Sequence, residues 1–205
     1  MKLIRMKLIL VPIGAIGFIA LIAYLFTIYG GINLIIPAEE QLFDAVSKRD
    51  LVRVNEILKS GKVKNIDKGF GGSGTSALIR AVENNEIEIV KVLIQAGANV
   101  NFEAQGRVTA LHMAAYFGYL EAARLLIRHD ANLDIPEDQN SLTPLHEAIW
   151  KRHVDIARLL VESGANIDAM TGDGRNAIMM ARRLGNDQFV SWLEQRIQKN
   201  IEIDK

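Results

Sequence analysis

Thr143-Pro144-Leu145-His146-Glu147-Ala148 opens a segment that recurs along the chain. Related openings begin at Ser76, Thr109 and Asn176, so four copies follow one another at intervals of 33 or 34 residues. A fixed period of this length is typical of stacked helical units, because one unit cannot bury its apolar face without a neighbour. The repeat therefore predicts an elongated scaffold of similar helical pairs.

Each copy carries signals for where its helices begin and end. The openings place Ser, Thr or Asn where free backbone amides need an acceptor, and Pro144 stands where a missing N–H has no cost. Gly61, Gly97, Gly164 and Asp130 follow the second helical run of their units, where a left-handed residue commonly ends a helix. Between these signals Leu, Ile and Val recur at helical spacing. The pattern therefore predicts two helices in each unit.

The pattern resembles the ankyrin repeat. The resemblance rests on residues 143–148 and on the trailing Gly164-Ala165-Asn166-Ile167-Asp168, and it covers roughly residues 40 to 200. It implies an all-α ankyrin-repeat solenoid of about five helix-turn-helix units. Residues 40–61 are expected to form an atypical first unit and residues 187–198 the last helix, so that two of the five units are caps.

The N-terminus predicts a membrane anchor. Lys2, Arg5 and Lys7 precede a run without charged residues from 8 to 38. Residues 8–29 would extend about 33 Å as a helix, which is enough for a bilayer core. We therefore expect a basic tail at 1–7, a transmembrane helix at 8–29, a linker at 30–39, the repeats at 40–200 and a tail at 201–205. A cleaved signal peptide is the alternative, although its apolar region usually spans only about 7–15 residues.

Charge also predicts the orientation of this anchor. The basic tail favours a cytoplasmic N-terminus. Lys48 and Arg49 follow the predicted helix and reduce the difference in basic residues between its two sides. No asparagine stands in an Asn-x-Ser/Thr glycosylation site, which favours a bacterial inner membrane with the repeats facing the periplasm. Export after signal-peptide cleavage is the alternative location.

Composition and motif spacing argue against catalysis. The 24 basic and 24 acidic residues balance, so the chain has no broad nucleic-acid footprint, and it has no cysteine for a disulfide or thiolate metal site. The glycine-rich residues 69–74 have the spacing of a dinucleotide fingerprint, but the preceding residues make a poor strand and no P-loop lysine follows. We expect a connecting loop there, and no enzyme activity, no cofactor and no small-molecule substrate.

The four histidines are also expected to be structural. His112 and His146 occupy matching positions in adjacent repeats, but no third ligand accompanies them, so local hydrogen bonding is preferred over a metal site. His129 and His153 are expected at the surface. We therefore expect no metal.

The resemblance implies a partner surface on the ankyrin concave face. It assigns this role to two consecutive residues just before the end of each first helix, which we call the binding stripe. The stripe comprises Glu83 and Asn84, Tyr116 and Phe117, Trp150 and Lys151, and Arg183 and Leu184. The loop tips nearby carry Arg107, Val108, Gln139, Leu142, Asp173 and Arg175. Phe117 has two open roles, partner contact or packing between repeats.

These expectations define two hypotheses for function. The first is a membrane-anchored protein–protein interaction module, an adaptor or inhibitor that binds a protein partner through the concave face and the bilayer through residues 8–29. Its aromatic and cationic stripe has the composition enriched at interface hot spots. The alternative is a structural subunit of a membrane complex whose transmembrane helix makes the main contact.

Overall fold

A computed structural model describes residues 36–203. The chain divides into two compact units, Met1–Ile36 and Pro37–Lys205, and the fold below is that of the second. The predicted basic tail and transmembrane helix, and the linker up to residue 35, lie outside the described residues. Within 36–203 no helix is both long and apolar enough to cross a membrane.

Helices in residues 36–203 follow one another in five pairs. The pairs are α2 (Ala38–Ser47) with α3 (Leu51–Lys59), α4 (Ala77–Glu83) with α5 (Ile87–Gln95), α6 (Ala110–Phe117) with α7 (Leu120–Arg128), α8 (Pro144–Trp150) with α9 (Val154–Glu162), and α10 (Ala177–Arg183) with α11 (Asp187–Ile203). A short 3-10 turn, η1 (Gln105–Arg107), lies in the loop before α6. The predicted all-helical repeat array of five helix pairs is thus confirmed for the described residues.

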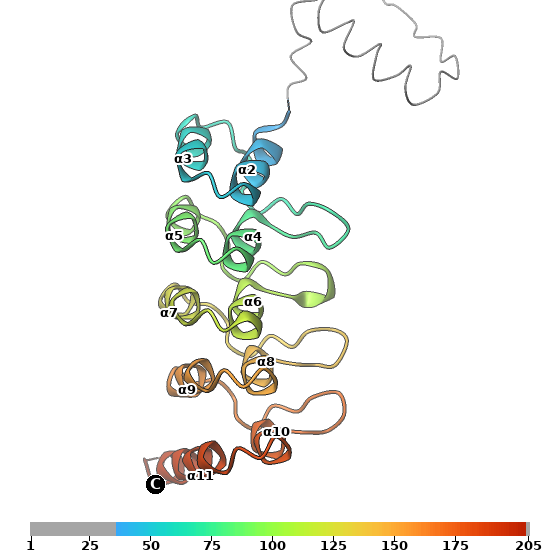
Figure 1. The fold of residues 1–205 in the computed structure, drawn as a ribbon, viewed down its shortest axis with the longest axis vertical. Coiled ribbons are helices and arrows are strands. Elements are labelled where there is room, and N and C mark those ends of the chain that lie inside the picture. The colour runs from blue at the N-terminus through green and yellow to red at the C-terminus, as the bar shows by residue number, and fades with distance from the viewer. Residues whose placement is uncertain (1–35, 204–205) are drawn as a thin grey trace, which may run out of the picture. The chain divides into compact units, whose positions relative to one another are not determined.

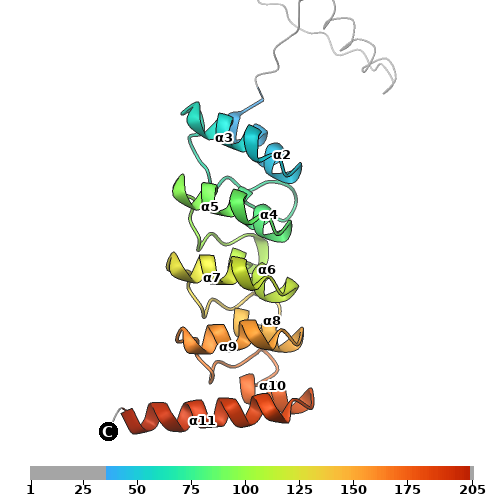
Figure 2. The same ribbon diagram turned by 60° about the vertical axis from the view of Figure 1, so that its left-hand side comes forward.

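The helices stack in two columns (Figure 1). The first helices of the pairs, α2, α4, α6, α8 and α10, form one column, and the second helices form the other. Long loops project from the first column between successive pairs, away from the second helices. Figure 2 shows that α11 lies across the end of the stack and projects sideways past α9, which suits a closing helix. We call the surface formed by the first helices and the projecting loops the inner face.

The repeat openings begin the first helices as their chemistry predicts. The side chain of Ser76 accepts a hydrogen bond from the backbone N–H of Ile79 at 3.3 Å, and that of Asn176 accepts from Met179 at 3.0 Å. Thr109 and Thr143 form reciprocal caps with the histidines three residues later. Each cap satisfies an amide that the helix itself leaves free.

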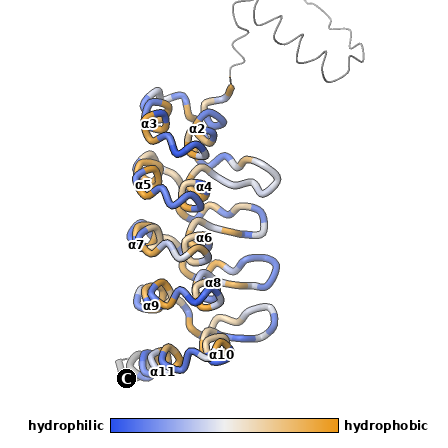
Figure 3. Tube along the Cα trace, in the orientation of Figure 1, coloured by the Kyte–Doolittle hydropathy of each residue, from blue (hydrophilic) through white to orange (hydrophobic). Residues whose placement is uncertain are grey.

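The apolar residues of both columns form one continuous core. Leu42, Leu78, Leu111, Leu145 and Leu193 are at most 1% exposed, and they come from five successive units. Figure 3 shows hydrophobic colour along the helices and mostly polar or neutral colour on the projecting loops. Burial of a leucine side chain contributes about 1.5–3 kcal/mol, so stability is distributed along the stack.

A ladder of asparagine and aspartate side chains joins successive units after their second helices. Backbone N–H groups donate to carboxylate or amide oxygens one unit earlier: Asn99 to Asp67 (2.9 Å), Asn132 to Asn101 (2.7 Å) and Asn166 to Asp134 (2.9 Å). The asparagine of each Gly-Ala-Asn or Asp-Ala-Asn motif therefore links units in addition to following a helix end.

The first and last helices of the repeat array are longer than the sequence predicts. Helix α2 begins at Ala38, directly after Pro37, whose fixed backbone geometry suits a helix start. Helix α11 begins at Asp187 as expected but continues to Ile203. An end helix has no following unit to terminate it, which explains the extra length.

Candidate protein-binding face

The inner face exposes three large aromatic side chains of the binding stripe. Tyr116, Phe117 and Trp150 are 39%, 43% and 52% exposed. They lie at the ends of α6 and α8, where the repeat register brings residues 33 or 34 positions apart onto the same side of the column. Their exposure contrasts with the buried leucines of the same helices, so packing alone does not explain them.

Aromatic rings and one cation form a cluster at the centre of the stripe. The ring of Phe117 lies edge-on to that of Tyr116, with centroids 5.0 Å apart, and stacks on Tyr119 at 5.5 Å. The ammonium nitrogen of Lys151 lies 3.9 Å from the centroid of Tyr116. Phe117 thus packs on neighbouring aromatic rings and still exposes a large part of its surface, so both of its expected roles are compatible with the structure.

A groove adjoins Trp150 between the fourth and fifth units. It has a volume of about 280 Å³. Its lining, which defines the groove below, comprises Asn140, Leu142, Trp150, Thr171, Asp173, Arg175 and Met180. The structure therefore brings Trp150 together with the tip residues Leu142, Asp173 and Arg175 around one groove.

Other members of the predicted site are engaged in contacts within the protein. Glu83 forms an ion pair with Arg80 at 3.0 Å, and the side-chain amide of Asn84 donates to the carbonyl of Val46 at 3.2 Å. The carbonyl of Leu184 accepts from Arg152 at 3.0 Å. The first contact lies within α4, and the other two join neighbouring units. Polar groups of Glu83, Asn84 and Leu184 are therefore already bonded within the protein, unlike the exposed aromatic rings at the centre of the stripe.

The loop tips carry exposed polar groups. Arg107 pairs with Glu103 at 2.8 Å, which raises the pKa of the Arg107 guanidinium. Arg175 forms an ion pair with Asp173, and Gln139 is exposed on the loop before α8. These groups lie on the projecting loops rather than on the α-helices (Figure 1), and polar groups of this kind are typical of an interface rim.

The two register-matched histidines are part of the helix caps. His112 is 2% exposed, its Nδ1 lies 2.9 Å from the Thr109 hydroxyl, and its Nε2 lies 3.2 Å from the carbonyl oxygen of Leu142. This network assigns the proton to Nε2, which donates to Leu142. Burial lowers the pKa of His112 and of His146. No group of three metal-ligating side chains occurs among the residues that the structure describes.

His153 differs from the expectation of a surface residue. It is half-buried, and its Nε2 lies 3.2 Å from the carbonyl oxygen of Tyr116 in the preceding unit. A Cβ atom added at Gly118 would lie 2.7 Å from the His153 ring. The side chain thus fills the space that this glycine leaves between two units, a contact that its local sequence does not indicate.

The glycine-rich segment is a connecting loop, as predicted. Phe70 and Thr75 exchange two backbone hydrogen bonds of 2.9 and 3.0 Å across it, closing a narrow loop before α4. The backbone of Gly69 passes so close to Gly74 that a Cβ atom would lie 2.4 Å from its carbonyl oxygen. Residues 60–69 form turns rather than the strand that a dinucleotide site needs.

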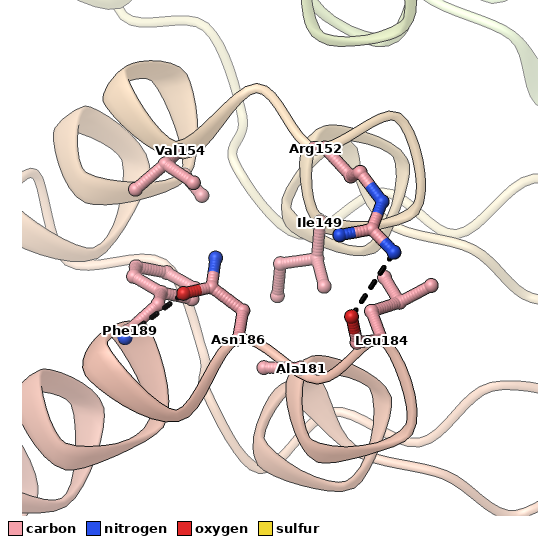
Figure 4. Close-up of a pocket in the computed structure, with 8 residues that line it drawn as sticks. Ile149, Arg152, Val154, Ala181, Leu184, Asn186 and Phe189 are labelled. Carbon is pink, nitrogen blue, oxygen red and sulfur yellow. Dashed lines mark hydrogen bonds between the residues drawn. The ribbon is translucent and has the colours of Figure 1, made fainter.

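A second cavity lies on the other side of α8 and has a different character. Figure 4 shows Ile149, Val154, Leu184 and Phe189 around it, with the hydrogen bond from Arg152 to the carbonyl of Leu184 at its edge. Its volume is about 10 Å³, which is room for about one water molecule. It is a packing gap between the fourth and fifth units rather than a binding site.

The sequence did not indicate three members of the face. Met180 lines the groove and lies three residues before Arg183 on α10, so helical spacing could have identified it. Thr171 and Asn140 come from loops of two different units, joined by the hydrogen bond from the Gly172 N–H to the Asn140 carbonyl at 2.6 Å. That pairing depends on how the units stack.

This arrangement is that of a protein-interaction module, in which stacked helix pairs present an exposed inner face. The sequence model of the family described as ankyrin repeats (3 copies) matches residues 42–137, 104–171 and 134–204. The chain therefore belongs to the ankyrin-repeat family.

Several curated proteins are similar to parts of the chain. Protein phosphatase 1 regulatory subunit 27 of Homo sapiens is 31% identical over 102 residues, which are 50% of this chain and 65% of that protein. The B-cell lymphoma 3 protein homolog of Mus musculus is 42% identical over 68 residues, 33% of this chain and 15% of that protein. The 2-5A-dependent ribonuclease of Homo sapiens is 43% identical over 56 residues, only 8% of its length.

The chain thus spans 65% or less of these relatives. The short match to the ribonuclease leaves most of that protein outside the comparison, and ankyrin repeats themselves are not catalytic. What the comparisons share with this chain is the repeat array, and the repeat array supports a protein partner.

Proposed function

We propose that this protein is a membrane-anchored adaptor or inhibitor that holds a protein partner on its inner face. The observation that carries the proposal is Trp150, which is 52% exposed beside an open groove and in the repeat register of the exposed Tyr116. Tryptophan and tyrosine are enriched among the residues that dominate binding energy. A monomeric scaffold gains nothing from exposing them in one row.

The anchor is proposed from the sequence. Residues 8–29 are uncharged and long enough to span a bilayer, and the basic residues before them favour an N-terminus in the cytoplasm. This places the repeats outside the cytoplasm, with a bacterial periplasm favoured. Attachment would restrict the module to partners at the same membrane and raise their effective concentration.

The experiment begins by crosslinking intact membranes that contain the full-length chain, to identify the bound protein. That protein is then titrated against the wild type and Trp150→Ala. We expect binding roughly tenfold to thirtyfold weaker for Trp150→Ala, as for other buried interface anchors. Val52→Ala is the matched control, because Val52 is 71% exposed but lies on α3, outside the inner face. Equal affinities for the wild type and Trp150→Ala would refute the proposal that the partner binds the stripe.

The second candidate is a structural subunit of a membrane complex, favoured by the length and uniform apolarity of residues 8–29. Replacing residues 8–29 with an unrelated spanning helix separates the two candidates. The adaptor retains its partner after the replacement, because the inner face makes the contact. A structural subunit loses assembly while Trp150→Ala has no effect.

A further inference from the structure

The groove has room for one side chain of a partner. Its volume of about 280 Å³ lies at the lower end of the roughly 300–1,000 Å³ that is usual for small-molecule sites. Leu142, Trp150 and the 5% exposed Met180 supply the apolar part of its lining. An apolar centre with a polar rim is the anatomy of a protein–protein contact, so an aliphatic or aromatic side chain is the fitting occupant.

Two cations of the binding stripe belong to the two units that line the groove. Lys151 follows Trp150 directly, and Arg183 occupies the Trp150 position of the next unit. Neither forms an ion pair within residues 36–203. Lys151 rests on the ring of Tyr116, and such a contact does not neutralise its charge.

Three acidic groups of the same region have contacts within the protein or are partly buried. Asp173 pairs with Arg175 and accepts a hydrogen bond from the Thr171 hydroxyl at 2.5 Å. Glu137 accepts from the backbone N–H of Asn140 at 2.8 Å. Glu147 is half-buried in α8; burial and then repulsion from Glu137 raise its pKa, and the nearby charge of Lys151 lowers it.

Lys151 and Arg183 therefore remain as cations of the binding stripe that form no ion pair within residues 36–203. A partner that covered Lys151 and Arg183 without supplying carboxylates would leave two cations poorly solvated, which opposes binding. Charge complementarity at this position thus selects among possible partners.

We infer that the partner docks through an acidic segment that inserts one apolar side chain beside Trp150 and places carboxylates against Lys151 and Arg183. This inference rests on the proposed function and names the chemistry of its partner. Complementary charges of this kind increase the association rate. They weaken with added salt, because the screening length is about 10 Å at an ionic strength of 0.1 M.

A displayed library of random 12-residue peptides, selected on the purified full-length protein, tests the inference. We expect the recovered peptides to carry Asp or Glu on both sides of an aromatic or aliphatic residue. Synthetic copies of these peptides should bind Lys151→Glu/Arg183→Glu on the order of tenfold more weakly than the wild type. Copies with lysine at each acidic position should regain affinity for that variant. Lys59→Glu/Lys62→Glu, on the first unit, is the charge-matched control.

The outcomes separate this inference from the proposed function. Peptides that need Trp150 but are neutral or basic would overturn the acidic segment and leave the binding stripe intact. A selection that yields no binder sensitive to Trp150→Ala would contradict both. Displacement of bound peptides by phosphatidylserine vesicles, but not by vesicles of neutral lipid, would show a lipid surface as the occupant and also overturn the inference. Melting curves that match the wild type show that each variant is folded, so that a change in affinity reports on the contact itself.

Discussion

The ammonium nitrogen of Lys151 lies 3.9 Å from the ring centroid of Tyr116, so a cation–π contact joins the fourth unit to the third. Both side chains belong to the binding stripe, and one contact therefore orders two candidate partner residues. Because Tyr116 is 39% exposed, solvent limits the strength of this contact.

A double-mutant cycle should detect this contact. We expect Lys151→Met and Tyr116→Leu to show a coupling free energy of about 0.5–1 kcal/mol, the range for exposed cation–π pairs. Urea unfolding of the two single variants and the double variant measures it. The wider Lys68–Phe70 pair, at 5.3 Å, serves as the comparison and should couple more weakly. A stripe pair with no coupling would show that the contact does not order these side chains.

Gly118 should resist substitution more than another left-handed glycine. Its φ of 83° disfavours any side chain, and a Cβ atom would lie 2.7 Å from the His153 ring. Gly61 has a φ of 66° but no atom within 4 Å of the same position. Gly61→Ala should therefore cost about 1–2 kcal/mol for the backbone alone, and Gly118→Ala should cost more.

Thermal or urea unfolding of both glycine variants provides the measurement. Adding His153→Ala to Gly118→Ala should recover the excess cost, once the cost of His153→Ala alone is subtracted. Equal destabilisation by the two glycine substitutions would mean that the His153 ring moves aside freely.

The side-chain ladder should couple neighbouring units. Asn101 accepts from the Asn132 N–H at 2.7 Å and donates to the carbonyl of Asp130 at 3.1 Å. Asn101→Ala removes both bonds and should lower the free energy of unfolding by about 1 kcal/mol, because these groups are partly solvated. Asn101→Asp keeps the acceptor and should lose less. If the two variants are equally stable in urea, the ladder oxygen contributes nothing measurable.

Acid should weaken the stack through its buried histidines. Burial lowers the folded-state pKa of His112 below 6.5, so the unfolded chain takes up the proton first as pH falls. The stability contribution of neutral His112 is complete above about pH 6.5 and declines below it, by at most about 1.4 kcal/mol per pH unit. Glu147, whose pKa is raised by burial, contributes in the opposite direction above its ordinary pKa.

Variants isolate the histidine contribution. The free energy of unfolding of His112→Gln, measured between pH 7.5 and 5, should fall less steeply with acid than that of the wild type. His129→Gln, at an exposed position, is the control substitution. If the free energy of unfolding of His112→Gln depends on pH as steeply as that of the wild type, His112 does not contribute to the loss of stability in acid.

The helix boundaries could be predicted because their causes are local. Ser76, Thr109, Thr143 and Asn176 cap helices through atoms only three residues away, and the repeat shows the same chemistry four times. The exposure of Trp150 could also be predicted, since register alone assigns it to the inner face.

The contacts between units could not be predicted in the same way. His153 meets the carbonyl of Tyr116, 37 residues earlier, and the groove combines Asn140 with Thr171 from different loops. Such pairs depend on how far one unit is shifted and rotated against the next, which the sequence of a single repeat does not specify. The repeat register assigns Asn84 to the partner surface, and its hydrogen bond to the carbonyl of Val46 depends on the same stacking. The ion pair of Glu83 with Arg80 lies within α4, so helical spacing could have indicated it.

Site-directed photocrosslinking tests most directly whether the inner face holds a protein partner. A photoreactive phenylalanine analogue replaces Phe117 on the stripe or Val52 on α3, one at a time, in the full-length chain within intact cells. We predict a discrete adduct with one protein from position 117 and none from position 52. Adducts from position 52 or from positions within residues 8–29, with none from position 117, would contradict the account.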